Sequence, residues 1–411
     1  MKKTMISSAL ACCFLANTSF AANDLNISAI LNFGYTDRAE FAGINTYGVG
    51  EHSEGLKQGF WIDHSEIALS SAIDDLFYGK LALALDEHEG ELELELEEAF
   101  IQTTALPYAL SIRAGRFLSN VGYLNNKHTH TDSFADRPLV YRTFLNNHYY
   151  DDGLRVDWIA PTDTYLAFGG EVFSGNKLPA YSNKNVGAHS VFIKAGDDIN
   201  ASHSWQLGAA YLSTNNQGTC DSHQHEEDIH SAELDEHDEH EHEHEHEENF
   251  DLCDFSGKKN YTLLDATWKW APNGNYKYEN FTLSAEYFIV HDQGSLSHEE
   301  HHEDEIEADE HLDDEESLLI NAKHRGFYLS GVYQFTPNWA AGLRYSEITF
   351  KAPYDTDFAP SISSAMLEYK HSHFSSIRLQ YNQDKSSEAL TDDQITLQFT
   401  MALGAHGAHA Y

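Results

Sequence analysis

The sequence predicts an all-β protein that folds as one transmembrane antiparallel β-barrel of about 16 strands with long extracellular loops. Apolar residues alternate with polar or small ones in segment after segment, and the connections between these segments are alternately short and long. No stretch after the N-terminal region is apolar for 18 residues, which excludes transmembrane helices. A soluble sandwich or propeller would not sort its loops by length in this way.

The first 21 residues have the features of a secretory signal peptide. Lys2 and Lys3 form a charged start, residues 5–16 are apolar, and Ser19-Phe20-Ala21 fits the small-x-small cleavage pattern. The apolar run is shorter than the roughly 20 residues that a membrane helix needs. We therefore expect the mature chain, residues 22–411, to be barrel throughout, with its first strand almost at the cleavage site.

The alternation continues along the whole mature chain, from residues 25–35 to residues 395–403. Successive side chains of a strand point to opposite faces, so a period of two gives one apolar and one polar face. Helices with 3.6 residues per turn do not explain this pattern, and strands of roughly ten residues cross a bilayer when tilted. The apolar face is expected to contact lipid and the polar face to line a lumen.

The connections support the same topology. The short ones carry turn residues, for example Asp74-Asp75, Asp197-Asp198 and Pro272-Asn273-Gly274. The long ones fall between them and comprise residues 37–57, 118–152, 174–188, 213–259, 292–325, 347–360 and 382–393. Outer-membrane barrels have short periplasmic turns and long outer loops, so the sequence predicts a location in the Gram-negative outer membrane.

Two of the long loops, residues 213–259 and 292–325, are rich in histidine and carboxylate and contain too few apolar residues to form a core. The first loop holds Cys220 and Cys253, the only cysteines left after signal cleavage, with no Lys or Arg between them. In an oxidising compartment this pair is expected to form a disulfide at the base of the loop. Free loop thiols and metal thiolates are the alternatives.

Both loops are candidate metal-binding segments, because neutral imidazole and carboxylate together suit Zn²⁺, and also Cu²⁺ or Ni²⁺. A flexible His-x-His run offers many exchangeable sites, which suits capture and release better than catalysis. The candidate ligands are His223, His225, His230, His237, His240, His242, His244 and His246 in the first loop, and His298, His301, His302 and His311 in the second. The alternative is a solvated acidic loop that only creates a negative potential.

The long loop of residues 118–152 is the candidate pore constriction, because one loop of a large porin often folds inward. Rings of charged side chains set the selectivity of pores. The residues expected to line the constriction are His128, His130, Asp132, Asp136, Arg137 and Arg142, with His148 nearby. The alternative is an external loop held by tyrosine and phenylalanine packing.

Strict alternation also predicts a ladder of charges on the lumenal wall. If Leu92, Leu94 and Leu96 face lipid, the glutamates between them face inward. The expected inward residues are Glu91, Glu93, Glu95 and Glu97, joined by Arg113, Arg155, Asp157, Glu286 and Arg344. Such a wall favours cations, unless internal salt bridges neutralise it.

Residues 115–158 resemble the phosphate-selective porin O/P family. The similarity lies in a Gly-aromatic strand end, in the Asp136-Arg137-Pro138 stretch of the following loop, and in the re-entry of the chain at Asp152-Gly153. The whole mature chain is similar to a subgroup of zinc-associated outer-membrane proteins, often labelled zinc-regulated TonB-dependent receptors. This subgroup shares the His/Glu-rich loops and a tail that here reads GAHGAHAY, residues 404–411.

The net charge of the chain indicates which ions the pore would attract. The chain has 25 Lys+Arg against 66 Asp+Glu, a formal net charge of −41, so it is expected to attract cations and not to bind nucleic acid. We therefore predict a porin that concentrates and passes divalent metal ions, with zinc loop-bound or transported. The alternatives are a general or anion-selective porin, as the family resemblance implies, and a surface metal-binding receptor with a closed barrel.

The remaining expectations concern chemistry and partners. No Gly-x-Ser-x-Gly motif is present and no Ser/His/Asp set stands out, so an enzyme is not expected. The expected partners are outer-membrane lipid, metal ions, the barrel-assembly machinery through the terminal Tyr411, and two further copies of the chain in a homotrimer.

Overall fold

The computed structural model describes residues 25–39, 44, 55–88, 91–182, 184–217, 255–296, 318–351 and 357–404, with the backbone alone for residues 86–88 and 91–92. Several predicted features lie outside these residues. They are the signal peptide (1–21), the His-rich runs of both acidic loops with Cys220 and Cys253, and the tail after residue 404.

The described chain consists mostly of strands. The first nine are β1 (Asn26–Asp37), β2 (Gly59–Ile62), β3 (Ser65–Ala72), β4 (Phe77–His88), β5 (Glu91–Thr103), β6 (Leu110–Leu118), β7 (Tyr150–Ile159), β8 (Tyr165–Phe173) and β9 (Ala188–Asn200). They are followed by β10 (His203–Gln217), β11 (Phe255–Trp270), β12 (Asn280–Leu296), β13 (Leu318–Gln334), β14 (Trp339–Thr349), β15 (Ser361–Ser372), β16 (Ser375–Lys385) and β17 (Asp392–Gly404). The helical segments are α1 (Leu139–Leu145), η2 (Pro107–Ala109), η3 (Thr129–Thr131) and η5 (Pro272–Gly274).

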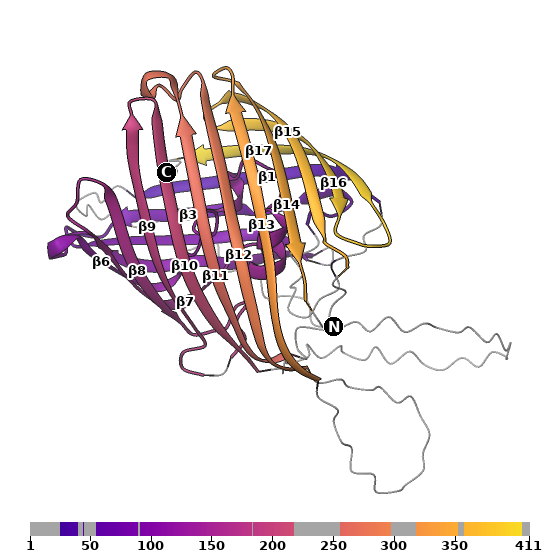
Figure 1. Cartoon of the computed structure of the whole chain (residues 1–411). Coiled ribbons are helices and arrows are strands. Elements are labelled where there is room, and N and C mark those ends of the chain that lie inside the picture. Colours follow the sequence, from indigo (N-terminus) through magenta and orange to yellow (C-terminus); the bar gives the residue numbers. More distant parts are fainter. Residues whose placement is uncertain are drawn as a thin grey trace, which may run out of the picture.

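These strands form one closed antiparallel sheet (Figure 1). Each strand except the β2–β3 pair is bonded to its neighbour in the sequence, and β17 pairs with β1, for example through Phe33 and Phe399. Within the described chain β2 and β3 both pair with β1, so they are two parts of one interrupted strand and the ring has sixteen strands. The predicted fold class is confirmed.

The interruption between β2 and β3 lies at Asp63 and His64. His64 has a φ of 46°, in the left-handed region that few residues with a side chain adopt, although histidine is among those enriched there. Asn32 of β1 holds the break: its side-chain amide donates to the Asp63 carbonyl at 2.7 Å, and its backbone N–H donates to Ser65 Oγ at 3.0 Å. The break therefore redirects the His64 side chain without opening the ring.

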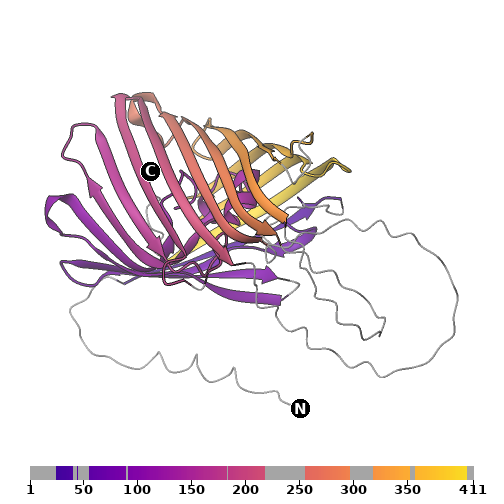
Figure 2. The ribbon, with the colours of Figure 1, turned by 60° about the horizontal axis from the view of Figure 1, so that its bottom comes forward.

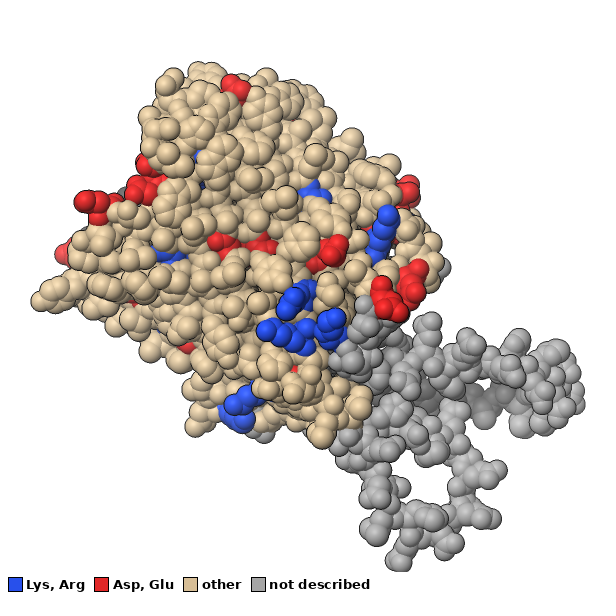
Figure 3. Space-filling view, viewed as in Figure 1, with Lys and Arg blue, Asp and Glu red and all other residues tan. Residues whose placement is uncertain are grey.

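The two faces of the barrel are chemically distinct, as β16 demonstrates. Ile377, Leu379 and Tyr381 are exposed, whereas Arg378 and Gln380 between them are buried. The exposed apolar side chains face outward, where a bilayer would cover them, and the buried polar ones face the lumen. Over much of the outer face in Figure 3 charged side chains are sparse, and lysines and arginines gather toward its lower edge.

Two details differ from the sequence-based expectation. The four strands β10–β13 have 15, 16, 17 and 17 residues rather than roughly ten. A tilted strand of that length rises about 40 Å, which exceeds the apolar thickness of a bilayer, so these strands extend beyond the membrane on the long-loop side. Asp197-Asp198 is not a turn, because β9 continues to Asn200 and pairs with β10 up to that point. No helix among the described residues is both long and apolar enough to span a bilayer.

The main buried apolar cluster lies inside the ring. It joins residues of the long β6–β7 connection, such as Val121, Leu139 and Leu145, to wall residues such as Phe173 and Phe288. Figure 2 shows this connection, including α1, within the ring of strands. The interior is therefore filled by a loop rather than by the strands alone.

Candidate pore constriction and its ionisable cluster

The inward loop is residues 119–149, and it enters and leaves the lumen at one point. The backbone N–H of Ser119 donates to the Tyr149 carbonyl at 3.0 Å. The buried Asn125 side chain donates to the carbonyls of Ser119 and Tyr149, both at 2.8 Å, and accepts from the Tyr149 N–H at 2.7 Å. One amide thus satisfies backbone groups that would otherwise be buried without partners.

A short helix, α1, forms the inner part of the loop. Pro138 precedes its first residue, and Asn146 ends it with a φ of 48°, as asparagine often does at a helix C-terminus. All seven residues of α1 are buried. Its position therefore depends on packing against the wall, chiefly β13 and β14, and against the rest of the loop.

Tyr141 fixes α1 to strands β12 and β13. Its hydroxyl lies 2.9 and 2.8 Å from the two carboxylate oxygens of Glu286, and Tyr328 donates to the same carboxylate at 2.8 Å. The N–H of Tyr123 adds a further bond at 2.9 Å. Gly122 is required beside them, because a Cβ there would lie 2.3 Å from Glu286 Oε2.

Asp136 fixes the loop to β14 and β16. Its carboxylate lies 2.7 Å from Arg344 and 3.5 Å from Arg142, and accepts a hydrogen bond from Gln380 at 2.6 Å. Burial alone raises the pKa of Asp136, but Arg344 and Arg142 outweigh this effect and hold the pKa below its ordinary value. Asp132 and Arg137 form an internal pair at 2.9 Å that holds the loop itself.

All six residues predicted for the constriction therefore lie inside the barrel. Asp132, Asp136, Arg137 and Arg142 form buried ion pairs, and His128 and His130 lie against the wall formed by β3 and β5. Their role in selectivity stays a prediction. The eight histidines of the first acidic loop and the four of the second lie outside the described residues.

The wall opposite His128 carries more carboxylate than strict alternation predicts. The pairing of β4 with β5 shifts between Ala82 and Leu83, so that Glu97 is an extra residue in β5. At this β-bulge Glu97 and Glu98 both point inward and are 2% and 4% exposed. Beyond the bulge the even-numbered residues of β5, Glu98, Phe100 and Gln102, consequently face the lumen. Before the bulge, alternation placed the odd-numbered glutamates on that face.

His128 lies at the centre of the resulting cluster. Its Nδ1 is 2.8 Å from Glu66 and 3.1 Å from Glu97, and its Nε2 is 2.8 Å from Glu98. Lys80 forms an ion pair with Glu98. Burial lowers the pKa of His128, but the carboxylates Glu66 and Glu98 outweigh burial and the nearby Lys80 and hold it well above its ordinary value.

A second imidazole pair lies on the other side of Glu97. His148 Nε2 is 3.0 Å and His64 Nε2 is 3.6 Å from Glu97 Oε1. The two rings meet edge to face with centroids 5.4 Å apart. Burial lowers the pKa of His148 and outweighs the opposing effect of Glu97, so this imidazole favours its neutral form, which is the form that ligates metals.

The cluster formed by Glu66, Glu97, Glu98, His64, His128 and His148 is called the lumenal His/Glu cluster below. Its three buried carboxylates face a single lysine, Lys80. Near β14, β16 and β1, by contrast, four arginines pair with three carboxylates: Arg142 and Arg344 with Asp136, Arg378 with Glu368, and Arg38 with Asp392. Carboxylates therefore outnumber lysines and arginines in the lumenal His/Glu cluster, whereas arginines outnumber their carboxylate partners near β14, β16 and β1.

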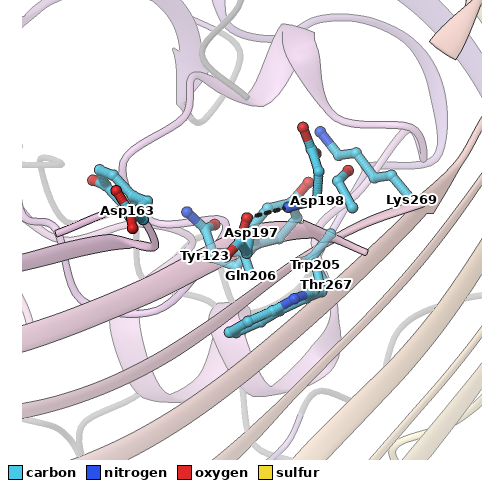
Figure 4. Close-up of a pocket in the computed structure, with 11 residues that line it drawn as sticks. Tyr123, Asp163, Asp197, Asp198, Trp205, Gln206, Thr267 and Lys269 are labelled. Atoms are coloured by element: carbon cyan, nitrogen blue, oxygen red, sulfur yellow. Dashed lines mark hydrogen bonds between the residues drawn. The ribbon is translucent and has the colours of Figure 1, made fainter. Parts of the chain in front are cut away.

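Open space lies between the loop and the short turns. A cavity of about 540 Å³ is lined by Tyr123, Asp163, Asp197, Asp198 and Lys269, among others (Figure 4). A smaller one of about 100 Å³ under the loop shares Tyr123. These acidic side chains at the short-turn end form a vestibule below the loop.

Comparison with known proteins supports the fold. No family model matches the sequence. An uncharacterized protein of Aquifex aeolicus (strain VF5) is 26% identical over 422 residues, covering 94% of this chain and 80% of that protein.

Several solved outer-membrane structures are similar to the barrel. The channel DcaP of Acinetobacter baumannii has a TM-score of 0.55 at 10% identity, covering 94% of this chain and 99% of that one. An anion-selective porin from Comamonas acidovorans gives 0.53 at 10%, covering 93% and 100%. The trimer form of OmpT, an outer-membrane protein of Vibrio cholerae, gives 0.52 at 9%, with the same coverage. The chain thus has the fold of an outer-membrane porin, and with its apolar outer face it belongs in the outer membrane of a Gram-negative cell.

Four residues of the site were not singled out from the sequence: His64, Glu66, Lys80 and Glu98. For two of them, Glu98 and His64, the sequence carries a weak signal. The consecutive Glu97-Glu98 breaks the alternation of β5, and Asp63-His64 interrupts the apolar run of β2 and β3. Neither break reveals which distant side chain will face it.

Proposed function

We propose that the protein is a passive outer-membrane channel that concentrates and passes divalent metal ions, with zinc the ion we expect. The observation that carries this proposal is the lumenal His/Glu cluster, which sets three buried carboxylates and three imidazoles against the inward loop. Carboxylate and imidazole are ligands for borderline cations such as Zn²⁺. The porin fold supports a channel over an enzyme.

Metal ions would meet the external acidic segments before they reach the lumen. A formal charge of −41 raises the local concentration of cations at the mouth, and the histidines of residues 213–259 and 292–325 add coordination. Metal captured there by many weak ligands remains exchangeable. The constriction then selects the ion by charge and ligation.

A general or anion-selective porin is the second candidate. It is favoured by the four arginines around β14, β16 and β1, and by the similarity to a porin described as anion-selective. Each of these arginines already lies beside a carboxylate, which reduces its attraction for a passing anion. A barrel closed by its loop, acting as a surface metal receptor, is the third candidate.

Ion currents across a planar bilayer separate these candidates. The mature protein is reconstituted under a KCl gradient, and conductance and reversal potential are recorded while Zn²⁺ is titrated. Two variants accompany it: one lacks residues 220–253, and in the other the eight histidines of that segment are replaced by asparagine. The second variant keeps the acidic charge and removes only the imidazoles.

A cation-selective current that low zinc modulates is the expected result, with the zinc response weakened in both variants because the lumenal His/Glu cluster remains. The response should also weaken as the pH falls, because the ligating imidazoles must be neutral. Anion selectivity, or a channel indifferent to zinc, would contradict the proposal and favour the general porin. No current with zinc still bound would identify the surface receptor.

A further inference from the structure

The wall of the lumen and the inward loop meet at three side chains with the chemistry of a metal site. His64 lies at the break between β2 and β3, Glu97 at the bulge of β5, and His148 at the end of the loop. One nitrogen or oxygen atom of each lies within 4.8 Å of the others, and all three residues are at least nine-tenths buried.

The distances agree with a shared metal ion. Glu97 Oε1 lies 3.0 Å from His148 Nε2 and 3.6 Å from His64 Nε2. In a tetrahedral zinc site with bonds of about 2 Å, neighbouring ligand atoms are about 3.3 Å apart. The two measured separations lie on either side of that value.

The partner of His64 points to the same arrangement. Asp63 Oδ1 lies 3.1 Å from His64 Nδ1, and a carboxylate only accepts, so Nδ1 carries the hydrogen. In the neutral ring the lone pair of Nε2 is then directed at the Glu97 carboxylate. A carboxylate behind the imidazole is the usual outer partner of a metal-binding histidine, because it fixes the tautomer and the ring orientation.

His148 directs one ring nitrogen at the site, its Nε2, which lies 3.0 Å from Glu97 Oε1. Its Nδ1 has no hydrogen-bond partner in the part of the chain that the structure describes, although the ring is buried. Its one polar contact there is Glu97. Nε2 is therefore the nitrogen through which His148 would bind a metal ion beside Glu97.

The neighbouring set of Glu66, Glu97 and His128 is a poorer ligand set. His128 Nδ1 lies 2.8 and 3.1 Å from Glu66 and Glu97, whereas its Nε2 lies 2.8 Å from Glu98 and 2.9 Å from the Lys80 ammonium. The Lys80 ammonium at this nitrogen repels a second cation, so the set is less suited to a metal ion. His128 serves as the counter-ion of the carboxylates instead.

We propose that His64, Glu97 and His148 bind one divalent transition-metal ion of the zinc class, and that this ion joins the inward loop to the barrel wall. Three protein ligands leave a fourth position for water, so the ion remains exchangeable. The site deepens the proposed function and rests on it for its role in transport. Metal binding itself is independent of flux and can be measured separately.

Zinc-edge anomalous diffraction of the full mature protein, crystallised with ZnCl₂, tests the site directly. The expected result is an anomalous peak between Glu97 Oε1 and the two Nε2 atoms. The absence of that peak at a zinc concentration that occupies the external histidines would overturn the proposal, because hydrogen bonds alone would then hold the three side chains together.

A solution measurement covers the case in which crystals do not form. Zinc binding to the folded state raises the unfolding midpoint. The zinc-dependent rise should be smaller in Glu97→Gln, in His148→Asn and in His64→Asn, where asparagine tolerates the left-handed backbone. His291 on β12 is the control, because its ring contacts Asn321 and lies away from the cluster. The variant His291→Asn should keep the full zinc-dependent rise. Equal rises in all four variants would overturn the proposal.

The two proposals fail separately. Anion-selective currents together with a zinc peak at the site would contradict the proposed transport function and support the metal site. Cation-selective, zinc-sensitive currents without an anomalous peak would contradict the metal site and support the transport function.

Discussion

At the scale of single residues, the lumen is organised by side chains that have more than one wall partner. Glu286 accepts from two tyrosines and two backbone N–H groups, and Asp136 lies between two arginines. Buried charges of this kind are costly to leave without partners, so each of these residues fixes the position of the loop.

Asp136 gives a prediction about pH. Because its folded pKa lies below the ordinary value of about 3.9, its contribution to stability is complete above that value and is lost as the pH falls through the lower folded pKa. Asp136→Asn should lower the free energy of unfolding by about 3–5 kcal/mol at pH 7, since it leaves Arg344 and Arg142 without a counter-charge. Urea unfolding in lipid vesicles at pH 7, 5 and 3 measures both effects.

The difference between Asp136→Asn and the wild type should be the same at pH 7 and pH 5 and should shrink toward pH 3. Asp75→Asn, in an exposed turn between β3 and β4, is the control and should have little effect at any pH. A difference that already shrinks between pH 7 and 5 would contradict the depressed pKa of Asp136.

Gly122 gives a prediction about the loop anchor. Gly122→Ala places a Cβ 2.3 Å from Glu286 Oε2 and 2.6 Å from the Tyr141 hydroxyl, at a φ of 69°. We expect the loop to shift and the single-channel current to become larger or noisier. Gly59→Ala shares the left-handed backbone, with a φ of 89°, but its Cβ has no atom within 4 Å. This control should cost about 1–2 kcal/mol of backbone strain and leave the current unchanged.

At the scale of elements, irregularities of the strands place the functional side chains. The bulge in β5 directs two consecutive glutamates inward, and the break between β2 and β3 directs His64 inward. Each is a local departure from ideal pairing inside an otherwise regular ring. Such departures are common near functional sites because they change the direction of a side chain without changing the fold.

Deleting Glu97 tests the bulge as an element. Leu96 already pairs with Leu83 and Glu98 with Ala82, so removal of the extra residue leaves an uninterrupted ladder with every other side chain on its present face. The variant should therefore fold and lose cation selectivity to the same extent as Glu97→Gln, as measured by reversal potential. A deletion variant that fails to insert, beside a normal Glu97→Gln, would show that the bulge is needed for assembly.

At the scale of the whole molecule, the ring separates an apolar outer surface from a charged lumen crossed by one loop. The loop contacts strands from β3 to β16, so it restricts the lumen at more than one wall. Passage of ions must follow the remaining space beside it. The carboxylate excess on the β3–β5 wall is the feature that we expect to decide the sign of the selectivity.

Oligomeric state is also a whole-molecule property. The homotrimer expected from the sequence stays a prediction. Native mass spectrometry of the detergent-solubilised protein, extracted without boiling, should give three times the mass of the mature chain. A single-chain mass under the same mild extraction would contradict this expectation.

The sequence by itself determined the barrel, its strand order, the sorting of its loops and the inward-facing polar residues of regular strands such as β16. These properties follow from the period-two alternation and from turn chemistry, which are local and can be read along the chain. Only the tertiary structure decided that His64, Glu97 and His148 meet, because they are brought together by a strand break, a bulge and a returning loop. Their contacts depend on register and ring closure, which no local pattern encodes.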